Sequence, residues 1–198
     1  MSILQWLIEQ AKNPKGFVGS TMLRIMNAAH SGMTKWVIQS GAIKDGDIIL
    51  DIGCGGGKTI QTLSIFNKSG KIYGIDFSEQ AVKNSIKANK GDVARGKVIV
   101  RKASVSSIPY PESFFDKITA FQTHYFWPNL AADVKEVFRV LKQGGQFMIV
   151  SEVYKINYHM KSYKTKTEIQ QLIENIGFQT AQVVEDTKKG WIYITGIK

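Results

Sequence analysis

A glycine-rich loop is the part of this sequence best suited to binding a ligand. Residues 51–57 read DIGCGGG and close the apolar run 48–52. Glycines let the backbone turn tightly and let a ligand approach the main chain closely. A helix that starts after such a loop offers free N–H groups and a positive dipole end to polar or anionic ligand groups. The loop therefore predicts a ligand site at the end of a strand.

Spacing within the loop separates three classes of ligand. A phosphate-binding P-loop has the pattern G-x-x-x-x-G-K-[ST], and residues 57–59 supply its end, but its first glycine would fall on Ile52. A dinucleotide fingerprint, G-x-G-x-x-G, begins at Gly53 and Gly55 and then lacks its third glycine. That single mismatch in a loose pattern leaves the dinucleotide class open. A third class has an acidic residue before the loop, here Asp51, which suits a ligand that carries a cation.

Two further residues could do chemistry near the same site. Asp76 ends the apolar run 71–76 and lies 21 positions after Gly55, about where a carboxylate binds a ribose diol beside a glycine loop. His124 follows the apolar run 114–122. Because the unperturbed pKa of histidine is close to neutrality, His124 is a candidate general base.

The elements that must position these residues alternate along the chain. The apolar runs predict strands, and the amphipathic segments between them predict helices. Strands are expected at 48–52, 71–76, 97–103, 114–122 and 146–153, with helices at 58–67, 78–90, 129–142 and 165–178. The final runs 179–186 and 190–198 are joined by a short turn and must pair antiparallel, since a parallel crossover needs a dozen residues or more.

The expected fold is thus an α/β, Rossmann-like, doubly wound sheet of seven strands, mostly parallel with a C-terminal antiparallel hairpin, plus N-terminal helices. We expect a single domain over residues 1–198, with residues 1–44 forming a helical cap or lid and 45–198 the α/β core. His30, in a Met- and Trp-rich helical stretch, could belong to that lid. Glu152, at the end of the fifth strand, is expected to face the same crevice as the loop.

Composition narrows the class of protein. The chain has 198 residues, 43% hydrophobic and 21% charged, typical of a globular domain. It has no apolar stretch of about 20 residues and no secretory signal pattern, so we expect a cytoplasmic protein without a membrane partner. The one cysteine, Cys54, permits neither an internal disulfide nor a cysteine metal cluster, and no metal is expected. The net charge of +10 comes mainly from dispersed lysines, which favours a solvated surface and leaves a nucleic-acid partner possible.

Four segments in this order resemble the class I S-adenosylmethionine-dependent methyltransferases, in particular the small-molecule group with an LDIGCGxG loop (methyltransferase type 11-like). They are 50–57 (LDIGCGGG), 74–78 (GIDFS), 104–116 (SVSSIPYPESFFD) and 137–145 (VFRVLKQGG). The resemblance covers about residues 45–152. It implies S-adenosyl-L-methionine as cofactor and S-adenosyl-L-homocysteine as product.

The resemblance also implies a set of cofactor-binding residues: Asp51, Gly53, Cys54, Gly55, Asp76, Phe77, Ser104, Val105 and Gln122. In it, Asp51 orients the amino-acid end of the cofactor, and the loop glycines let the methionine moiety lie close. Asp76 binds the ribose hydroxyls, Phe77 contacts the adenine face, and Val105 offers its N–H to adenine. Ser104 departs from the family, which usually has an aspartate there, so a charge-assisted hydrogen bond is lost.

The acceptor is less well defined by the sequence. Methyl transfer from a sulfonium is an in-line displacement, so positioning matters more than a fixed catalytic motif. Residues 122–129 (QTHYFWPN) lack the [DNS]-P-P-[YFW] motif of nucleic-acid amine methylases, which favours a small-molecule acceptor. The aromatic residues of this loop are expected to form a pocket wall. An RNA methyltransferase and a non-catalytic cofactor-binding protein are the alternatives.

Overall fold

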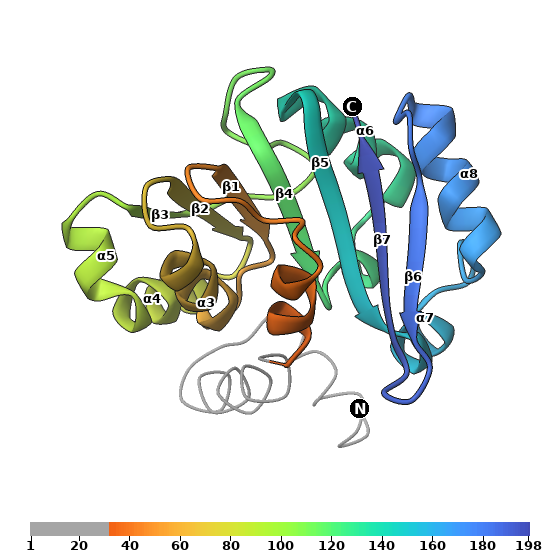
Figure 1. The fold of residues 1–198 in the computed structure, drawn as a ribbon, viewed down its shortest axis with the longest axis horizontal. Coiled ribbons are helices and arrows are strands. Elements are labelled where there is room, and N and C mark those ends of the chain that lie inside the picture. Colours follow the sequence, from red (N-terminus) through yellow and green to blue (C-terminus); the bar gives the residue numbers. More distant parts are fainter. Residues whose placement is uncertain (1–31) are drawn as a thin grey trace.

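The computed structural model describes residues 32–198, in which a seven-stranded sheet is flanked by helices (Figure 1). The strands are β1 (Ile48–Ile52), β2 (Lys71–Asp76), β3 (Val98–Lys102), β4 (Phe115–Phe121), β5 (Leu141–Glu152), β6 (Gln182–Asp186) and β7 (Trp191–Ile197). The helices are α3 (Lys58–Phe66), α4 (Glu79–Ala88), α5 (Lys90–Ala94), α6 (Leu130–Val140), α7 (Val153–His159) and α8 (Lys166–Ile176), with a 3₁₀ turn η1 (His124–Phe126). Residues 32–39 are also helical.

The strand order β3-β2-β1-β4-β5-β7-β6 confirms the predicted doubly wound sheet. The pairs among β1 to β5 are parallel, while β7 pairs antiparallel with both β5 and β6. The chain moves outward in one direction from β1 to β3 and in the other from β4 onward. A crevice at such a switch point, outside the carboxyl ends of the strands, is where open α/β sheets bind ligands. The fold therefore places the site after β1 and β4.

Alternating residues of the strands build a core on each face of the sheet. On one face, Leu50 and Phe147 pack with α6 and α8. On the opposite face, Ile49 packs with α3, and Met148 packs with the helical residues 32–39. Both faces are therefore covered, as a sheet with parallel apolar strands requires.

The structure changes three local predictions. The predicted helix 129–142 ends at Val140, and β5 already begins at Leu141. There the chain pairs with β4 through a register shift, and Gly144 turns with φ 73°. The predicted helix 78–90 divides into α4 and α5 at Asn89. Helix α7 was not predicted, because the segment after β5 has only a short amphipathic run, with Ile156 as its buried residue.

Local signals in the sequence explain several element ends. The Ser78 hydroxyl accepts from the Ala81 N–H at 3.3 Å and caps α4. Thr165 and Glu168 form a reciprocal capping box at the start of α8. Gly177 ends α8 with a φ of 118°, which glycine adopts without a steric penalty. Within residues 32–198 no helix has the length and apolar character that a bilayer crossing requires.

Candidate functional site

The glycine loop is held against the end of β2 by main-chain hydrogen bonds. The N–H groups of Gly53 and Cys54 donate to the Ile75 carbonyl at 2.8 and 3.1 Å. Gly53 has φ 69°, a left-handed conformation that disfavours other residues. A Cβ at Gly53 would also lie 2.8 Å from the Cβ of Thr123. Glycine is therefore required here both by the backbone and by the close approach of the loop after β4.

Asp76 lies where the sequence predicted a ribose-binding carboxylate. Its Oδ2 accepts from the Gly55 N–H at 3.0 Å and its Oδ1 from the Ser78 N–H at 2.9 Å. Burial raises the pKa of Asp76, and the two N–H donors partly offset this rise. An ionised carboxylate has about four acceptor sites, so Asp76 can still accept hydrogen bonds from two hydroxyl groups.

A cavity of about 420 Å³ opens beside this carboxylate, within the size range of small-molecule sites. Of the predicted cofactor residues, five line it: Gly53, Asp76, Phe77, Ser104 and Val105. The remaining wall consists of Ile52, Ile75, Ala103, Thr123, Phe126, Trp127 and Pro128. The loop after β4, predicted as a pocket wall, thus faces the glycine loop across one cavity.

Phe77 and Ser104 occupy the outer part of the cavity wall. Phe77 is 49% exposed next to the buried Asp76 and lines the cavity, so its ring is accessible to a ligand there. The Ser104 hydroxyl accepts from the Ser106 N–H at 3.1 Å and so shapes the turn after β3. Residues 76–77 and 103–105 together form a polar edge and an apolar surface that match a nucleoside.

Asp51 and Cys54 lie behind this wall. Asp51 is 1% exposed and accepts a hydrogen bond from the Thr119 hydroxyl at 2.9 Å. Burial raises the pKa of Asp51 to about 7, an effect that the Thr119 bond opposes and the charge of Asp76 reinforces. Burial also raises the pKa of the Cys54 thiol well above its usual value. The Cys54 side chain packs toward Gly74, where a Cβ would lie 3.1 Å from its Sγ. Its contribution to a ligand would therefore come from its backbone.

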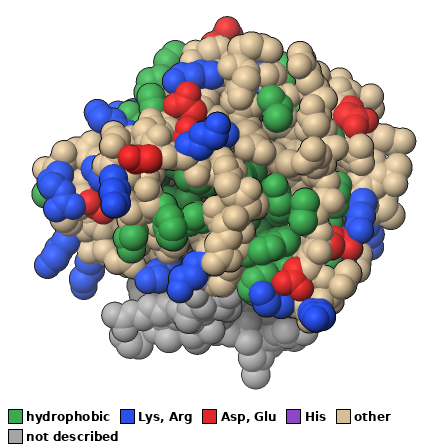
Figure 2. All heavy atoms as spheres, viewed as in Figure 1, with side chains coloured by type: hydrophobic (Ala, Val, Ile, Leu, Met, Phe, Trp, Pro, Cys, Tyr) green, Lys and Arg blue, Asp and Glu red, His purple; other side chains and the backbone are tan. Residues whose placement is uncertain are grey.

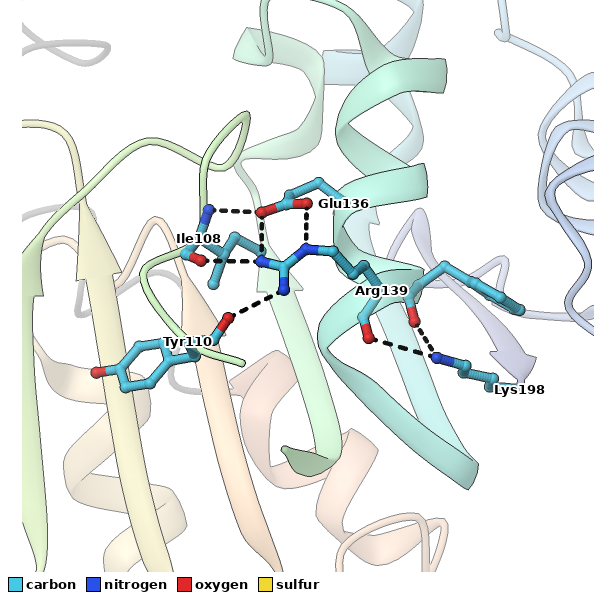
Figure 3. Close-up of polar contacts among 6 residues, drawn as sticks. Ile108, Tyr110, Glu136, Arg139 and Lys198 are labelled. Carbon is cyan, nitrogen blue, oxygen red and sulfur yellow. Dashed lines mark hydrogen bonds and ion pairs between the residues drawn. The ribbon is translucent and has the colours of Figure 1, made fainter. Parts of the chain in front are cut away.

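Two charged residues of α6 anchor the segment that follows Ser104 (Figure 3). Arg139 forms a two-pronged ion pair with Glu136, at 2.7 and 2.8 Å. Its guanidinium also donates to the carbonyls of Ile108 and Tyr110, each at 3.1 Å. Glu136 in turn accepts from the Ile108 N–H at 2.9 Å. This clamp holds the loop that carries Ser104 and Val105. Its signals in the sequence were the i, i+3 spacing of a carboxylate and an arginine and the resemblance of segment 137–145 to the methyltransferase family.

On the acceptor side, His124 does not line the cavity. Its ring is 1% exposed, its Nδ1 lies 3.1 Å from the Ser151 hydroxyl, and its Nε2 has no hydrogen-bond partner. Burial lowers the pKa of His124 to about 3. A general base must come within hydrogen-bond reach of its substrate, so these observations favour a packing role. The role of His124 as a base stays a prediction.

Gln122 and Glu152 also do not line the cavity. The Gln122 amide donates to the Glu152 carboxylate at 3.0 Å and accepts from the Tyr125 hydroxyl at 3.1 Å. The prediction that Gln122 binds the cofactor therefore gains no support from its side chain, which is 3% exposed. The lid prediction for His30 lies outside the described residues. Within residues 32–198 no cluster of three acidic, histidine or cysteine side chains is arranged to hold a metal ion.

The fold and the site define a Rossmann-like protein that binds a nucleoside cofactor at the switch point of its sheet. The donor set fits S-adenosylmethionine. The cavity offers a buried carboxylate for two hydroxyls at Asp76, an exposed ring for adenine at Phe77, and a glycine backbone at Gly53 for the methionine moiety.

Comparisons with known proteins agree with this class. A family model described as a methyltransferase domain matches residues 50–149. The chain is 30% identical over 128 residues to the uncharacterized methyltransferase YdaC of Bacillus subtilis, covering 65% of this chain and 68% of YdaC. It is 32% identical to the sterol 4-C-methyltransferase strm-1 of Caenorhabditis elegans, over 72% of this chain but only 43% of that protein.

The fold has a close counterpart among solved structures. A SAM-dependent methyltransferase from Aquifex aeolicus superposes with a TM-score of 0.75 over 90% of this chain and 97% of that one, at 20% identity. This likeness confirms the fold alone. On the family match, the chain belongs to the S-adenosylmethionine-dependent methyltransferases, and S-adenosylmethionine is its cofactor.

Proposed function

We propose that this chain transfers the methyl group of S-adenosylmethionine to a small, largely apolar acceptor. The observation that carries the proposal is the shared cavity: Asp76 and Phe77 line it on one side, and Phe126, Trp127 and Pro128 line it on the other. A cofactor bound at the first side would meet an acceptor held by the apolar side chains of the second. The sterol acceptor named for the similar C. elegans protein is of this chemical class.

The chemistry requires little of the protein beyond positioning. When bound, the sulfonium cofactor supplies a methyl group that is already activated for in-line displacement. The described residues orient both reactants: Asp76 fixes the ribose, the Gly53 backbone admits the amino-acid end, and the Phe126–Pro128 wall excludes water. Holding two reactants in line can by itself account for a large part of a rate enhancement.

Residues 32–39 support the proposal that the N-terminal segment belongs to the same domain. Met33 and Val37 pack against Phe121 of β4 and Met148 of β5. These contacts lie on the strands that lead into the acceptor wall. Of the predicted cap 1–44, residues 1–31 lie outside the described residues. For residues 32–39 we infer from this packing that they belong to the same domain as the α/β core.

The face of the molecule drawn in Figure 2 gives the RNA-methyltransferase alternative little support. Several lysine and arginine side chains gather at the left edge of this face, with acidic and apolar side chains among them. Several lysines are also neutralised by acidic neighbours, among them Lys142 by Asp116 at 2.7 Å and Lys155 by Glu152 at 2.7 Å. A nucleic-acid site would instead gather its cations along one track.

Calorimetry with S-adenosylhomocysteine, S-adenosylmethionine and NAD tests the cofactor site. We expect binding of the first two and none of NAD, with Asp76→Ala weakening S-adenosylhomocysteine binding at least tenfold through the loss of charge-assisted bonds. Binding of NAD alone would contradict the assignment.

A screen of small apolar acceptors, read out as S-adenosylhomocysteine formation, then tests the transfer. A steep salt dependence of tRNA binding at physiological ionic strength would move the proposal to RNA. Cofactor binding without turnover on any acceptor, RNA included, would favour a non-catalytic binding protein.

A further inference from the structure

The side chain of Gln122 joins three elements at the end of β4. Its amide nitrogen donates to Glu152 Oε2 at 3.0 Å, and its amide oxygen accepts from the Tyr125 hydroxyl at 3.1 Å. The same oxygen accepts from the Glu152 N–H at 3.3 Å, and the nitrogen lies 3.3 Å from the sulfur of Met33. Gln122 thus links the acceptor loop, the end of β5 and the helical residues 32–39.

Only an amide satisfies all these partners. Burial raises the pKa of Tyr125, with the charge of Glu152 adding to the effect, so the phenol remains a hydrogen-bond donor. The Glu152 carboxylate, paired with Lys155 at 2.7 Å, is an acceptor. A glutamate at position 122 could accept from the phenol but would bring a second carboxylate against Glu152, which is unfavourable for both charges.

The backbone of Gln122 is also held in an uncommon conformation. Its φ is 56°, in the left-handed region that few residues other than glycine adopt. Its N–H donates to the Val150 carbonyl at 2.8 Å, which continues the pairing of β4 with β5. Strained backbone of this kind persists where the surroundings over-determine it, and it is concentrated at functional sites.

The network reaches the cavity through aromatic contacts. The Tyr125 ring stacks on His159 of α7, with 5.0 Å between ring centroids and 11° between planes. Phe126 packs edge-on against both rings, at 4.6 Å from Tyr125 and 4.9 Å from His159. Phe126 itself lines the cavity. A shift of the Tyr125 ring would therefore move the acceptor wall.

We propose that Gln122 is a positioning residue for the acceptor wall: through Tyr125 and Glu152 it fixes the loop 123–128, whose Thr123, Phe126 and Trp127 line the cavity. The inference rests on the proposed function, because it takes this wall as the acceptor side. It assigns Gln122 a role through other residues, in place of direct contact with the cofactor.

The test uses the full chain labelled with 5-fluorotryptophan, whose four resonances report on the four tryptophans. The Trp127 line is assigned by Trp127→Phe. Gln122→Gly keeps a residue that adopts a positive φ but removes the amide, and Tyr125→Phe removes only the hydroxyl. The matched control is Tyr110→Phe, which removes a buried hydroxyl that has no hydrogen-bond partner.

We expect Gln122→Gly and Tyr125→Phe each to shift or broaden the Trp127 line and to weaken S-adenosylhomocysteine binding roughly fivefold, the scale of one hydrogen bond. Tyr110→Phe is expected to change none of these. The inference is overturned if Gln122→Gly and Tyr125→Phe both show the wild-type Trp127 line and the wild-type affinity for S-adenosylhomocysteine. If Gln122→Gly fails to fold, Tyr125→Phe decides alone. A wild-type chain that does not bind S-adenosylhomocysteine refutes the proposed function, while the comparison of Trp127 lines still decides the role of Gln122.

Discussion

Replacing Asp51 with asparagine separates the contribution of this residue to stability from its contribution to binding. Asp51 is fully enclosed at the end of β1, and its carboxyl group accepts a hydrogen bond from Thr119 at 2.9 Å. Asparagine is nearly isosteric, and its carbonyl oxygen can accept the same bond. The substitution therefore removes the ionisable group and little else.

The magnitude follows from the pKa of Asp51, which burial raises from its ordinary 3.8 to about 7. The folded protein thus binds this proton more tightly than the unfolded chain does. The stability contributed by the group is complete below about pH 4 and is lost as the pH rises through about 7. Since one pKa unit corresponds to about 1.4 kcal/mol, ionising Asp51 costs roughly 4 kcal/mol more in the folded protein. From about pH 5 to about pH 8, the free energy of unfolding of Asp51→Asn should therefore rise by roughly 2 to 3 kcal/mol relative to that of the wild type.

Guanidinium denaturation of both proteins at the two pH values measures this difference. Asp116→Asn is the control of opposite sign. Burial raises the pKa of Asp116, but bonds from Lys142 and the Ile48 N–H outweigh burial and hold that pKa below its ordinary value. That variant should lose stability relative to the wild type as the pH rises through the acid range. A difference between Asp51→Asn and the wild type that does not change with pH would refute the reasoning.

Asp51→Asn is also expected to bind S-adenosylhomocysteine more weakly than the wild type, because the ammonium group of the ligand loses a nearby negative charge. For the wild type, affinity should fall as the pH drops below about 7 and Asp51 becomes protonated. Calorimetry across this range checks both statements. A variant that is more stable yet binds less tightly would identify Asp51 as a functional residue maintained at a cost in stability.

Three further predictions concern the glycine loop and two residues that pack outside the cavity. Gly53→Ala should weaken S-adenosylhomocysteine binding at least tenfold in calorimetry, because a Cβ there would displace the acceptor loop. Gly96→Ala, at the same φ of 69° but with nothing within 4 Å of the new Cβ, should leave binding unchanged, and equal effects of the two would contradict the argument. Arg139→Lys should lower the free energy of unfolding by about 1 to 3 kcal/mol in guanidinium titrations, since lysine cannot reproduce the clamp on Glu136 and two carbonyls. His124→Asn should leave the pH profile of methyl transfer unchanged near neutrality, because a group with a pKa of about 3 does not titrate there; loss of an inflection near pH 7 would instead support its role as a base.

Much of the fold could be predicted because its signals are local. The apolar runs that became β1 and β2 have the predicted bounds, and the stop signal at Gly177 ends α8 as expected. Asp76 and Gly53 could be placed at one site because Asp76 ends β2 and Gly53 follows β1, and the carboxyl ends of these parallel strands meet at the same edge of the sheet. Helix α7 and the early start of β5 could not be predicted from the sequence, since their positions depend on the strands and loops they pack against.

The sequence by itself determined the α/β class, the glycine loop and the carboxylate that ends the next strand, since each depends on residue type and short-range spacing. Tertiary structure alone decided which side chains face the cavity. His124 and Gln122 follow the same strand as Thr123 and Phe126, yet they are buried against Ser151 and Glu152 of β5. That direction is set by the left-handed turn at Gln122 and by the stacking of α7 on the loop. Contacts between residues about 30 positions apart leave no local pattern for sequence reasoning to detect.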